Sequence, residues 1–165
     1  MSRREKGSRK RLMKELVDSR AGTQGAADHV FLEPVDEHDL SQWTIVLTPE
    51  KGSLYESGQF KIAVTISDRY PIQPPLFRFL TPVCHPNVHA TSGEICLDVL
   101  KDEWSPAWTL HAAALAILVL LDNPDPTSPL NCDAGNLLRS EDRRAYNSLV
   151  RTYTSLHASE DLGCK

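Results

Sequence analysis

The segment between residues 29 and 80 restricts the fold most, because it holds four strand-like stretches with no helical stretch among them. Gln59–Ser67 alternates most clearly, since every second residue from Phe60 to Ile66 is apolar. The other strand candidates are His29–Pro34, Gln42–Leu47 and Leu76–Leu80. Consecutive strands joined by polar, glycine-bearing connections such as PEKGSLYESG predict an antiparallel meander.

Helical patterns flank this predicted sheet on both sides. Before it, residues 8–19 place apolar side chains at helical spacing, with Ser8 as the expected N-cap and the stretch Gly22–Gly25 as the expected end. The apolar face predicted for this helix consists of Leu12, Met13, Leu16 and Val17. One helix, four strands and then further helices, without βαβ alternation, predict the α+β class.

Two helices are expected directly after the reactive part of the chain described below. Thr109–Leu121 is apolar almost all round, which predicts a helix buried in the core, and the prolines that follow end it. A short helix is expected over residues 131–139, with Asn131 or Asp133 as its N-cap.

The last predicted helix is Glu141–His157, with Ser140 as its N-cap. Its predicted buried face consists of Ala145, Leu149 and Tyr153. These elements together predict one domain over residues 8–158, a flexible basic tail over residues 1–7 and a C-terminal tail over residues 159–165.

Charge is unevenly distributed along the chain, whose formal net charge is −4. Residues 1–14 hold seven Lys or Arg and one Glu, so the remaining residues carry a net charge of −10. An acidic folded body argues against nucleic-acid binding. The longest apolar run, Leu110–Leu121, is shorter than the roughly 20 residues of a membrane span. A charged start without a signal peptide, and four cysteines without a CxxC pair, predict a reduced intracellular compartment.

The stretch Cys84–Trp108 concentrates reactive side chains in a segment with almost no helical or strand periodicity. Loops longer than about 12–15 residues are uncommon in compact domains and are usually functional. Cys96 is the candidate nucleophile, and the alternative is a small buried hydrophobic residue. Asn87 is either an oxyanion donor or a turn residue.

Histidines leave two further alternatives open. His85 or His89 is available as a general base for the thiol, although neither lies in a motif typical of cysteine proteases. Alternatively, Cys84, His85, His89 and Cys96 supply four zinc ligands, although their C-H-x3-H-x6-C spacing is not a usual structural arrangement.

Several ordered motifs in and around this stretch strongly resemble the catalytic region of the ubiquitin-conjugating enzymes. Within the stretch they read His85-Pro86-Asn87, Gly93-Glu94-Ile95-Cys96-Leu97-Asp98 and Trp104-Ser105-Pro106-Ala107. The match continues in the flanking segments Tyr70-Pro71-Ile72-Gln73-Pro74-Pro75 and Asp125-Pro126-Thr127-Ser128-Pro129-Leu130. The resemblance covers roughly residues 8–158 and implies the α+β fold of that family.

The resemblance implies that Cys96 accepts ubiquitin from the activating enzyme as a thioester and passes it on with a RING-type ligase. Asn87 matches the family asparagine that is credited with oxyanion stabilisation, loop support or both, and His85 and Pro86 support that motif. Asp98 and Ser128 match positions beside the path of the incoming nucleophile. No metal and no bound cofactor is implied, because ATP is used by the upstream activating enzyme.

Two contact surfaces are implied as well. The basic first helix, with Arg9, Lys10 and Lys14, matches the surface that meets the activating enzyme. The loop positions that contact RING-type ligases are matched by Ile72, Pro106 and Ala107.

Two departures from the common family pattern matter. The loop between Asn87 and Cys96 is one residue longer, and Ser128 stands where many members carry aspartate. A lysine, with a pKa of about 10.4, needs more help to lose its proton than a cysteine, with a pKa of about 8.5. Serine offers no carboxylate for that step, so a cysteine acceptor is compatible with Ser128.

Within the family, the sequence around Cys96 and the sequence from Ser128 to Arg139 are most similar to those of the peroxisomal members. This similarity implies an import receptor as substrate, a peroxisomal membrane anchor protein as partner and a peripheral place on the cytoplasmic face of that membrane. The rival hypotheses are another pathway or ubiquitin-like modifier, and a non-catalytic ubiquitin-binding relative. Free thiols are expected at Cys84 and Cys132, with a regulatory disulfide between them as the alternative.

Overall fold

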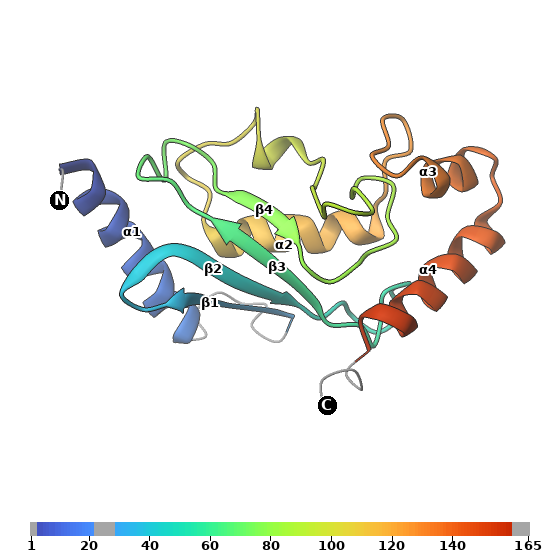
Figure 1. Ribbon diagram of the computed structural model, residues 1–165, viewed down its shortest axis with the longest axis horizontal. Coiled ribbons are helices and arrows are strands. Elements are labelled where there is room, and N and C mark those ends of the chain that lie inside the picture. The colour runs from blue at the N-terminus through green and yellow to red at the C-terminus, as the bar shows by residue number, and fades with distance from the viewer. Residues whose placement is uncertain (1–2, 22–28, 160–165) are drawn as a thin grey trace.

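A computed structural model describes residues 3–21 and 29–159 of the chain (Figure 1). Its elements are, in order, α1 (Arg3–Arg20), β1 (Val30–Asp36), β2 (Asp39–Leu47), β3 (Phe60–Thr65), β4 (Leu76–Phe79), the short 3₁₀ helix η1 (Asp98–Leu100), α2 (Leu110–Asp122), α3 (Cys132–Arg139) and α4 (Arg143–His157). The predicted α+β class and all the predicted strands and helices are therefore confirmed.

The four strands form one antiparallel sheet in the order β1-β2-β3-β4, which is the predicted meander. Alternation sets its faces: Ile45 pairs with Ile62, Ile62 pairs with Phe79, and all three side chains are buried. Their shared face is the sheet's side of the hydrophobic core.

Helix α2 lies across one face of the sheet and closes this core, while α1 lies at one end of the molecule and α3 and α4 at the other (Figure 1). Its residues Leu110, Ala113 and Ile117 are fully buried, as the apolar sequence predicts. Thr109 caps α2 by accepting a hydrogen bond from Ala112 N. The long segment between β4 and α2 is thereby held at both ends by rigid elements.

The first helix differs from its prediction at the N-terminal end. It begins at Arg3, so Ser8 is an interior, buried residue and not an N-cap. Residues 3–7 accordingly belong to α1, because Arg, Glu and Lys are good helix formers and a single Gly costs only about 1 kcal/mol. The buried face is also narrower than predicted, since Met13 is 42% exposed and Val17 is 60% exposed.

The start of α4 is the second correction. Ser140 is the C-cap of α3, and Asp142 caps α4 by accepting from Ala145 N. Glu141 lies between the two caps with a positive φ of 59°, which ends one helix and lets the next begin. The buried positions of α4 are therefore one residue later than predicted: Tyr146, Val150 and Thr154.

Some predictions fall on residues outside the described ranges. They are the helix end at Gly22–Gly25, the first two residues of the predicted N-terminal tail, and residues 160–165 of the C-terminal tail, which include Cys164. Over residues 3–21 and 29–159, no helix is both long and apolar enough to cross a lipid bilayer.

Candidate active site

Cys96 lies in the segment between β4 and α2, with its side chain partly buried. The backbone around it is fixed, because Ile95 is buried and Leu97 packs against the core. Cys96 N donates a 2.9 Å hydrogen bond to Asn87 O, which ties the cysteine to the His85-Pro86-Asn87 turn. The structure therefore shows a partly exposed thiol on an anchored backbone.

His85 is a structural residue of this turn. Asn87 N donates to His85 Nδ1 at 3.0 Å, so the ring proton resides on Nε2, which lies 2.9 Å from Leu120 O at the end of α2. Burial lowers the pKa of His85 to about 4. The ring is therefore neutral near neutral pH and links the turn to α2.

Both nitrogens of His85 are thus engaged, which makes the zinc hypothesis and the general-base hypothesis wrong for this residue. His89 accepts from Ser92 N at 3.1 Å through Nδ1 and so supports its own turn. Within the described parts of the chain, no group of three or more His, Cys, Asp or Glu is placed to hold a metal ion.

Asn87 joins the turn to the segment that follows α2. Its Nδ2 donates to Asp125 O at 2.8 Å, and Asp125 N donates to its Oδ1 at 2.8 Å. Pro86 O accepts from Leu130 N at 2.8 Å and from Asn131 N at 3.0 Å. The loop between Asp125 and Leu130 is consequently fastened at both ends to the Pro86–Asn87 turn, which gives the asparagine a loop-supporting role.

Asp98 and Ser128, the predicted neighbours of the nucleophile's path, are both exposed. Asp98 begins η1, immediately after Leu97, and Ser128 lies in the fastened loop between Asp125 and Leu130. Since Asn87 is bonded both to Cys96 and to Asp125, these two elements are connected through one residue.

Gly93 shapes the hairpin that precedes Cys96. This hairpin is closed by the isolated bridge between Val88 and Ile95 and by the bond from Gly93 N to His89 O at 2.9 Å. Gly93 has a φ of 70°, and a Cβ placed on it would lie 2.0 Å from Phe79 O of β4. Only glycine fits, so the longer loop between Asn87 and Cys96 is packed directly onto the sheet.

Cys84, Cys96 and Cys132 are free cysteines. The free thiols expected at Cys84 and Cys132 are therefore confirmed, and the alternative disulfide between them is not formed. Cys84 is buried, and desolvation raises the pKa of its thiol to about 11. Its carbonyl accepts from the hydroxyl of the fully buried Tyr55 at 2.8 Å. Cys84 therefore packs in the core, as a structural residue does.

The residues predicted to contact a ligase are exposed on two neighbouring loops. Ile72 is 73% exposed, and Pro106 and Ala107 are exposed on the other loop. Trp104 Nε1 donates to Pro71 O at 2.9 Å and so joins the two loops. The residues predicted to contact the activating enzyme, Arg9, Lys10 and Lys14, are all exposed on α1.

Two parts of this arrangement were missed by sequence reasoning. The buried carboxylate of Glu15 in α1 accepts hydrogen bonds from Tyr70 OH and Leu110 N, and the backbone of Asp125 holds Asn87. In the sequence, Glu15 stands out only as a charged residue next to the apolar positions Leu12 and Leu16. Helical spacing places it at the edge of the buried face and does not predict that its carboxylate is buried.

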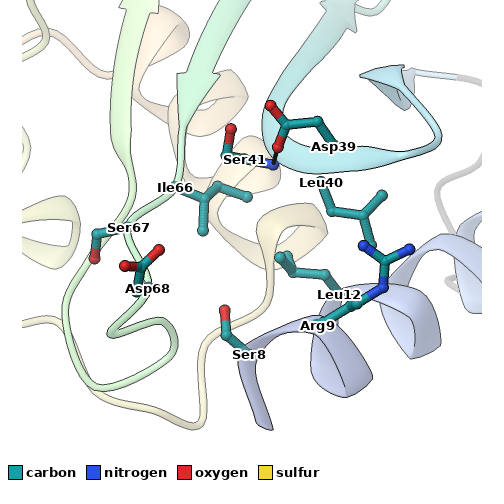
Figure 2. A pocket seen from close by; sticks show the side chains of 9 residues that line it. All are labelled: Ser8, Arg9, Leu12, Asp39, Leu40, Ser41, Ile66, Ser67 and Asp68. Atoms are coloured by element: carbon teal, nitrogen blue, oxygen red, sulfur yellow. Dashed lines mark hydrogen bonds between the residues drawn. The ribbon is translucent and has the colours of Figure 1, made fainter. Parts of the chain in front are cut away.

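A cavity of about 360 Å³ lies away from the thiol, between the N-terminal half of α1, the start of β2 and the end of β3 (Figure 2). Its lining residues are Ser8, Arg9, Leu12, Asp39, Leu40, Ser41, Ile66, Ser67 and Asp68. Asp39 accepts a hydrogen bond from Ser41 N at 2.9 Å, which occupies one carboxylate oxygen. None of the predicted catalytic residues lines this cavity.

Comparison with known proteins agrees with this fold. A family profile described as ubiquitin-conjugating enzyme matches residues 11–154. The chain is 46% identical to Protein PEROXIN-4 of Arabidopsis thaliana, over 94% of this chain and 98% of that protein. It is also 46% identical to ubiquitin-conjugating enzyme E2 16 of Schizosaccharomyces pombe, over 93% of this chain and 96% of that protein.

A solved structure gives the same result. The ubiquitin-conjugating enzyme Pex4p of H. polymorpha, crystallised in complex with the soluble domain of Pex22p, superposes with a TM-score of 0.86 at 34% identity. The superposition covers 92% of this chain and 98% of that chain. The chain belongs to the ubiquitin-conjugating enzyme family, a family of transferases. Within that family it is closely related to the proteins named peroxin-4 or PEX4.

Proposed function

We propose that the protein accepts ubiquitin from the activating enzyme as a thioester on Cys96 and transfers it, with a RING-type ligase, to a peroxisomal import receptor. The observation that carries this proposal is the partly exposed Cys96 thiol, set on a backbone that Asn87 O fixes at 2.9 Å. The family relationship supports ubiquitin as the modifier, and the relatives' names support a peroxisomal pathway.

The transfer chemistry has two balanced steps. The Cys96 thiolate attacks the carbonyl carbon of ubiquitin's thioester on the activating enzyme, a new C–S bond forms, and the activating enzyme's thiolate leaves. In the second step an acceptor thiolate or amine attacks the Cys96 thioester, and the Cys96 thiolate leaves. An amine must also release a proton, whereas a thiolate has already done so.

Asn87 supports both steps from its fixed position. Its amide group has two N–H donors, and Asp125 O uses one of them. The second N–H is available for the oxyanion that forms at the thioester carbonyl, a contribution that is worth about 2.7–4 kcal/mol where such donors have been removed.

The surroundings of the thiol favour a cysteine acceptor. Ser128 provides a hydroxyl and no carboxylate, and both ring nitrogens of His85 are engaged. The exposed Asp98 is the one predicted catalytic carboxylate, and it remains available to orient the incoming group. An acceptor that reacts as a thiolate places the smallest demand on such a site.

A charging reaction with activating enzyme, ubiquitin and ATP tests the proposal. The wild type is expected to form a thiol-sensitive adduct, and Cys96→Ser a stable oxyester. Cys132→Ser is the matched control, because Cys132 is an exposed free cysteine outside the site, and it should charge normally. No adduct on the wild type, or an adduct that survives in Cys96→Ala, contradicts the proposal. Parallel reactions with other ubiquitin-like modifiers test the modifier.

Discharge to free cysteine and to free lysine tests the acceptor. The charged wild type is expected to lose ubiquitin faster to cysteine, and Ser128→Asp is expected to raise the rate with lysine. An unchanged cysteine-to-lysine ratio in Ser128→Asp argues against the proposed part of Ser128.

The proposed place of action is the cytoplasmic face of the peroxisomal membrane, reached through a membrane anchor protein. The structural relative Pex4p was crystallised with the soluble domain of Pex22p, and this motivates the proposed anchor. Fractionation of cells with intact peroxisomes tests it. The tagged protein is expected with the membranes and in the alkaline-extractable fraction, and a wholly cytosolic protein contradicts the assignment.

A further inference from the structure

Among the described residues of α1, Glu15 has a buried carboxylate that is hydrogen-bonded to three donors. Glu15 is 3% exposed and accepts three hydrogen bonds. The donors are Arg11 Nε at 2.6 Å, Tyr70 OH at 2.6 Å and Leu110 N at 2.8 Å. A buried carboxylate persists only where such donors compensate its desolvation, so this arrangement is specific in geometry.

The bond to Leu110 N acts as a helix cap supplied by another helix. Leu110 is the first residue of α2, and Thr109 caps the helix at Ala112 N, so Leu110 N has no partner inside the helix. A carboxylate at this end is also favoured by the α2 dipole. Glu15 therefore locks α1 to the start of α2.

The same carboxylate is linked to both loops that carry the proposed ligase contacts, directly to one and through Arg11 to the other. Tyr70 lies two residues before Ile72, and the carbonyl of Pro71 accepts from Trp104 Nε1 at 2.9 Å. On the other side, Arg11 Nη2 donates to Trp108 O at 3.1 Å, one residue after Ala107. Glu15 is thus bonded directly to the segment of Ile72, through Tyr70, and is linked to the segment of Ala107 through Arg11.

Two cavities lie along the N-terminal half of α1. Ser8, Arg9 and Leu12 line the α1 side of the 360 Å³ cavity (Figure 2), and a second cavity of about 490 Å³ lies between Gly7, Ser8 and the segment Asp68–Ile72. In its interior, α1 is held by the buried Leu12 and Leu16 and by the bonds of Glu15. At its surface, Arg9 donates to His38 O at 3.2 Å and Arg20 donates to Glu37 at 2.6 Å.

We propose that Glu15 is a positioning residue that holds α1, the Ile72 loop and the Pro106–Ala107 loop in one fixed relative placement. This inference rests on the proposed function, because the loops are the proposed ligase surface and α1 is the proposed surface for the activating enzyme. Neutralising Glu15 loosens both loops together and leaves the Cys96 thiol and the Asn87–Asp125 clamp as they are.

Kinetics separate this role from a general loss of stability. With the purified RING domain of a peroxisomal ligase as the probe, Glu15→Gln is expected to raise the KM for the RING domain about fivefold or more. Unassisted discharge of Cys96 to free cysteine should be unchanged. The matched control is Val150→Ala, which removes buried apolar atoms from α4 and should leave that KM unchanged. An equal KM change in both variants, or a fall in kcat at constant KM, overturns the inference.

Hydrogen exchange tests whether Glu15 holds the two loops in place, and it needs no catalytic reaction. Its result therefore does not depend on whether the proposed function is correct. The amides of Ile72 and Trp108 are protected by bonds to Arg69 O at 2.7 Å and to Ser105 O at 3.0 Å. Glu15→Gln is expected to speed exchange at both amides. Tyr70→Phe removes one donor only and should affect Ile72 more than Trp108. Exchange that changes only at Leu110 overturns the inference.

Discussion

The side chain of Asn87 and the main chain of Asp125 form a closed ring of two hydrogen bonds, each 2.8 Å long. The main-chain carbonyl of the same asparagine accepts from Cys96 N. One residue therefore sets the distance between the thiol's segment and the loop that carries Ser128. Loop support and oxyanion donation are compatible here, because they use different N–H groups of one amide.

Removal of this amide is expected to affect stability and catalysis together. Asn87→Ala leaves Asp125 N and O without their partners, so the free energy of unfolding should fall by about 1–3 kcal/mol. If the second N–H serves the oxyanion, discharge of the Cys96 thioester should fall about 10²-fold or more. Urea denaturation and single-turnover discharge measure the two effects.

The control for this experiment is Asn136→Ala, an exposed asparagine in α3 whose side chain accepts only from Arg139 among the contacts of the described residues. It should change neither quantity appreciably. A stability loss in Asn87→Ala with unchanged discharge would leave loop support as the residue's whole role.

Gly93→Ala is expected to be strongly destabilising. The new Cβ would lie 2.0 Å from Phe79 O, at a φ of 70°, so the hairpin before Cys96 must move off the sheet. We expect a loss of about 3 kcal/mol or more, at the upper end of usual single substitutions, together with slower charging of Cys96. Chemical denaturation and the charging assay measure both.

Gly52→Ala separates steric clash from backbone strain. Gly52 also has a positive φ, of 99°, but its Cβ would meet nothing within 4 Å. Its stability loss should be smaller and its charging normal. Equal losses in the two variants would show that the contact with Phe79 has no cost of its own.

Stability should decrease as the pH falls from about 6.5 to about 4, partly because of His85. Burial lowers the pKa of His85 to about 4 in the folded protein, whereas in the unfolded chain it is about 6.5. The unfolded chain therefore binds a proton first, and the folded state loses up to about 3 kcal/mol over this interval and no more below it.

Denaturation at several pH values measures this slope in the wild type and in His85→Gln, whose side chain does not titrate. The slope should be smaller in His85→Gln and unchanged in His38→Gln, where the ring is exposed. Burial also lowers the pKa of His111, so some slope should persist in both variants. Identical slopes in wild type and His85→Gln would contradict the prediction.

The described thiols should react in a definite order. Cys132 is exposed and Cys96 is partly buried, so both should be alkylated in the native protein. Cys84 is 6% exposed and burial raises the pKa of its thiol to about 11, so at pH 7.5 it should react only after unfolding. Peptide mapping after iodoacetamide treatment, with a urea-unfolded sample as reference, gives the order. Rapid labelling of Cys84 in the native protein would contradict its burial.

Local sequence patterns correctly predicted the buried face of strands and helices whose buried side chains are apolar. Alternation in β3 and the all-apolar surface of α2 predict burial directly, because a residue's face follows from its spacing along a strand or helix. Spacing fails where polar residues are buried with partners. In α1 the pattern predicts that Met13 and Val17 are buried, whereas the buried residue beside Leu16 is Glu15.

The helix boundaries show the same limit. Serine is a residue type favoured at N-caps, but Ser140 is the C-cap of α3. Because Glu141 has a positive φ, the turn between the helices ends later than predicted, and the buried positions of α4 shift by one residue. Cap identity depends on which amide meets which oxygen, and that follows from the chain's path in space.

By itself, the sequence determined the meander, the buried helix and the segment that holds Cys96, since these follow from periodicity and from ordered motifs. Only the tertiary structure decided what each reactive side chain is bonded to. It brought Nε2 of His85 to Leu120 O, the side chain of Asn87 to Asp125, and the buried Glu15 to Leu110 N. The physical reason is that these partners lie far apart in the chain, 38 residues for Asn87 and Asp125 and 95 for Glu15 and Leu110, so no local pattern records them.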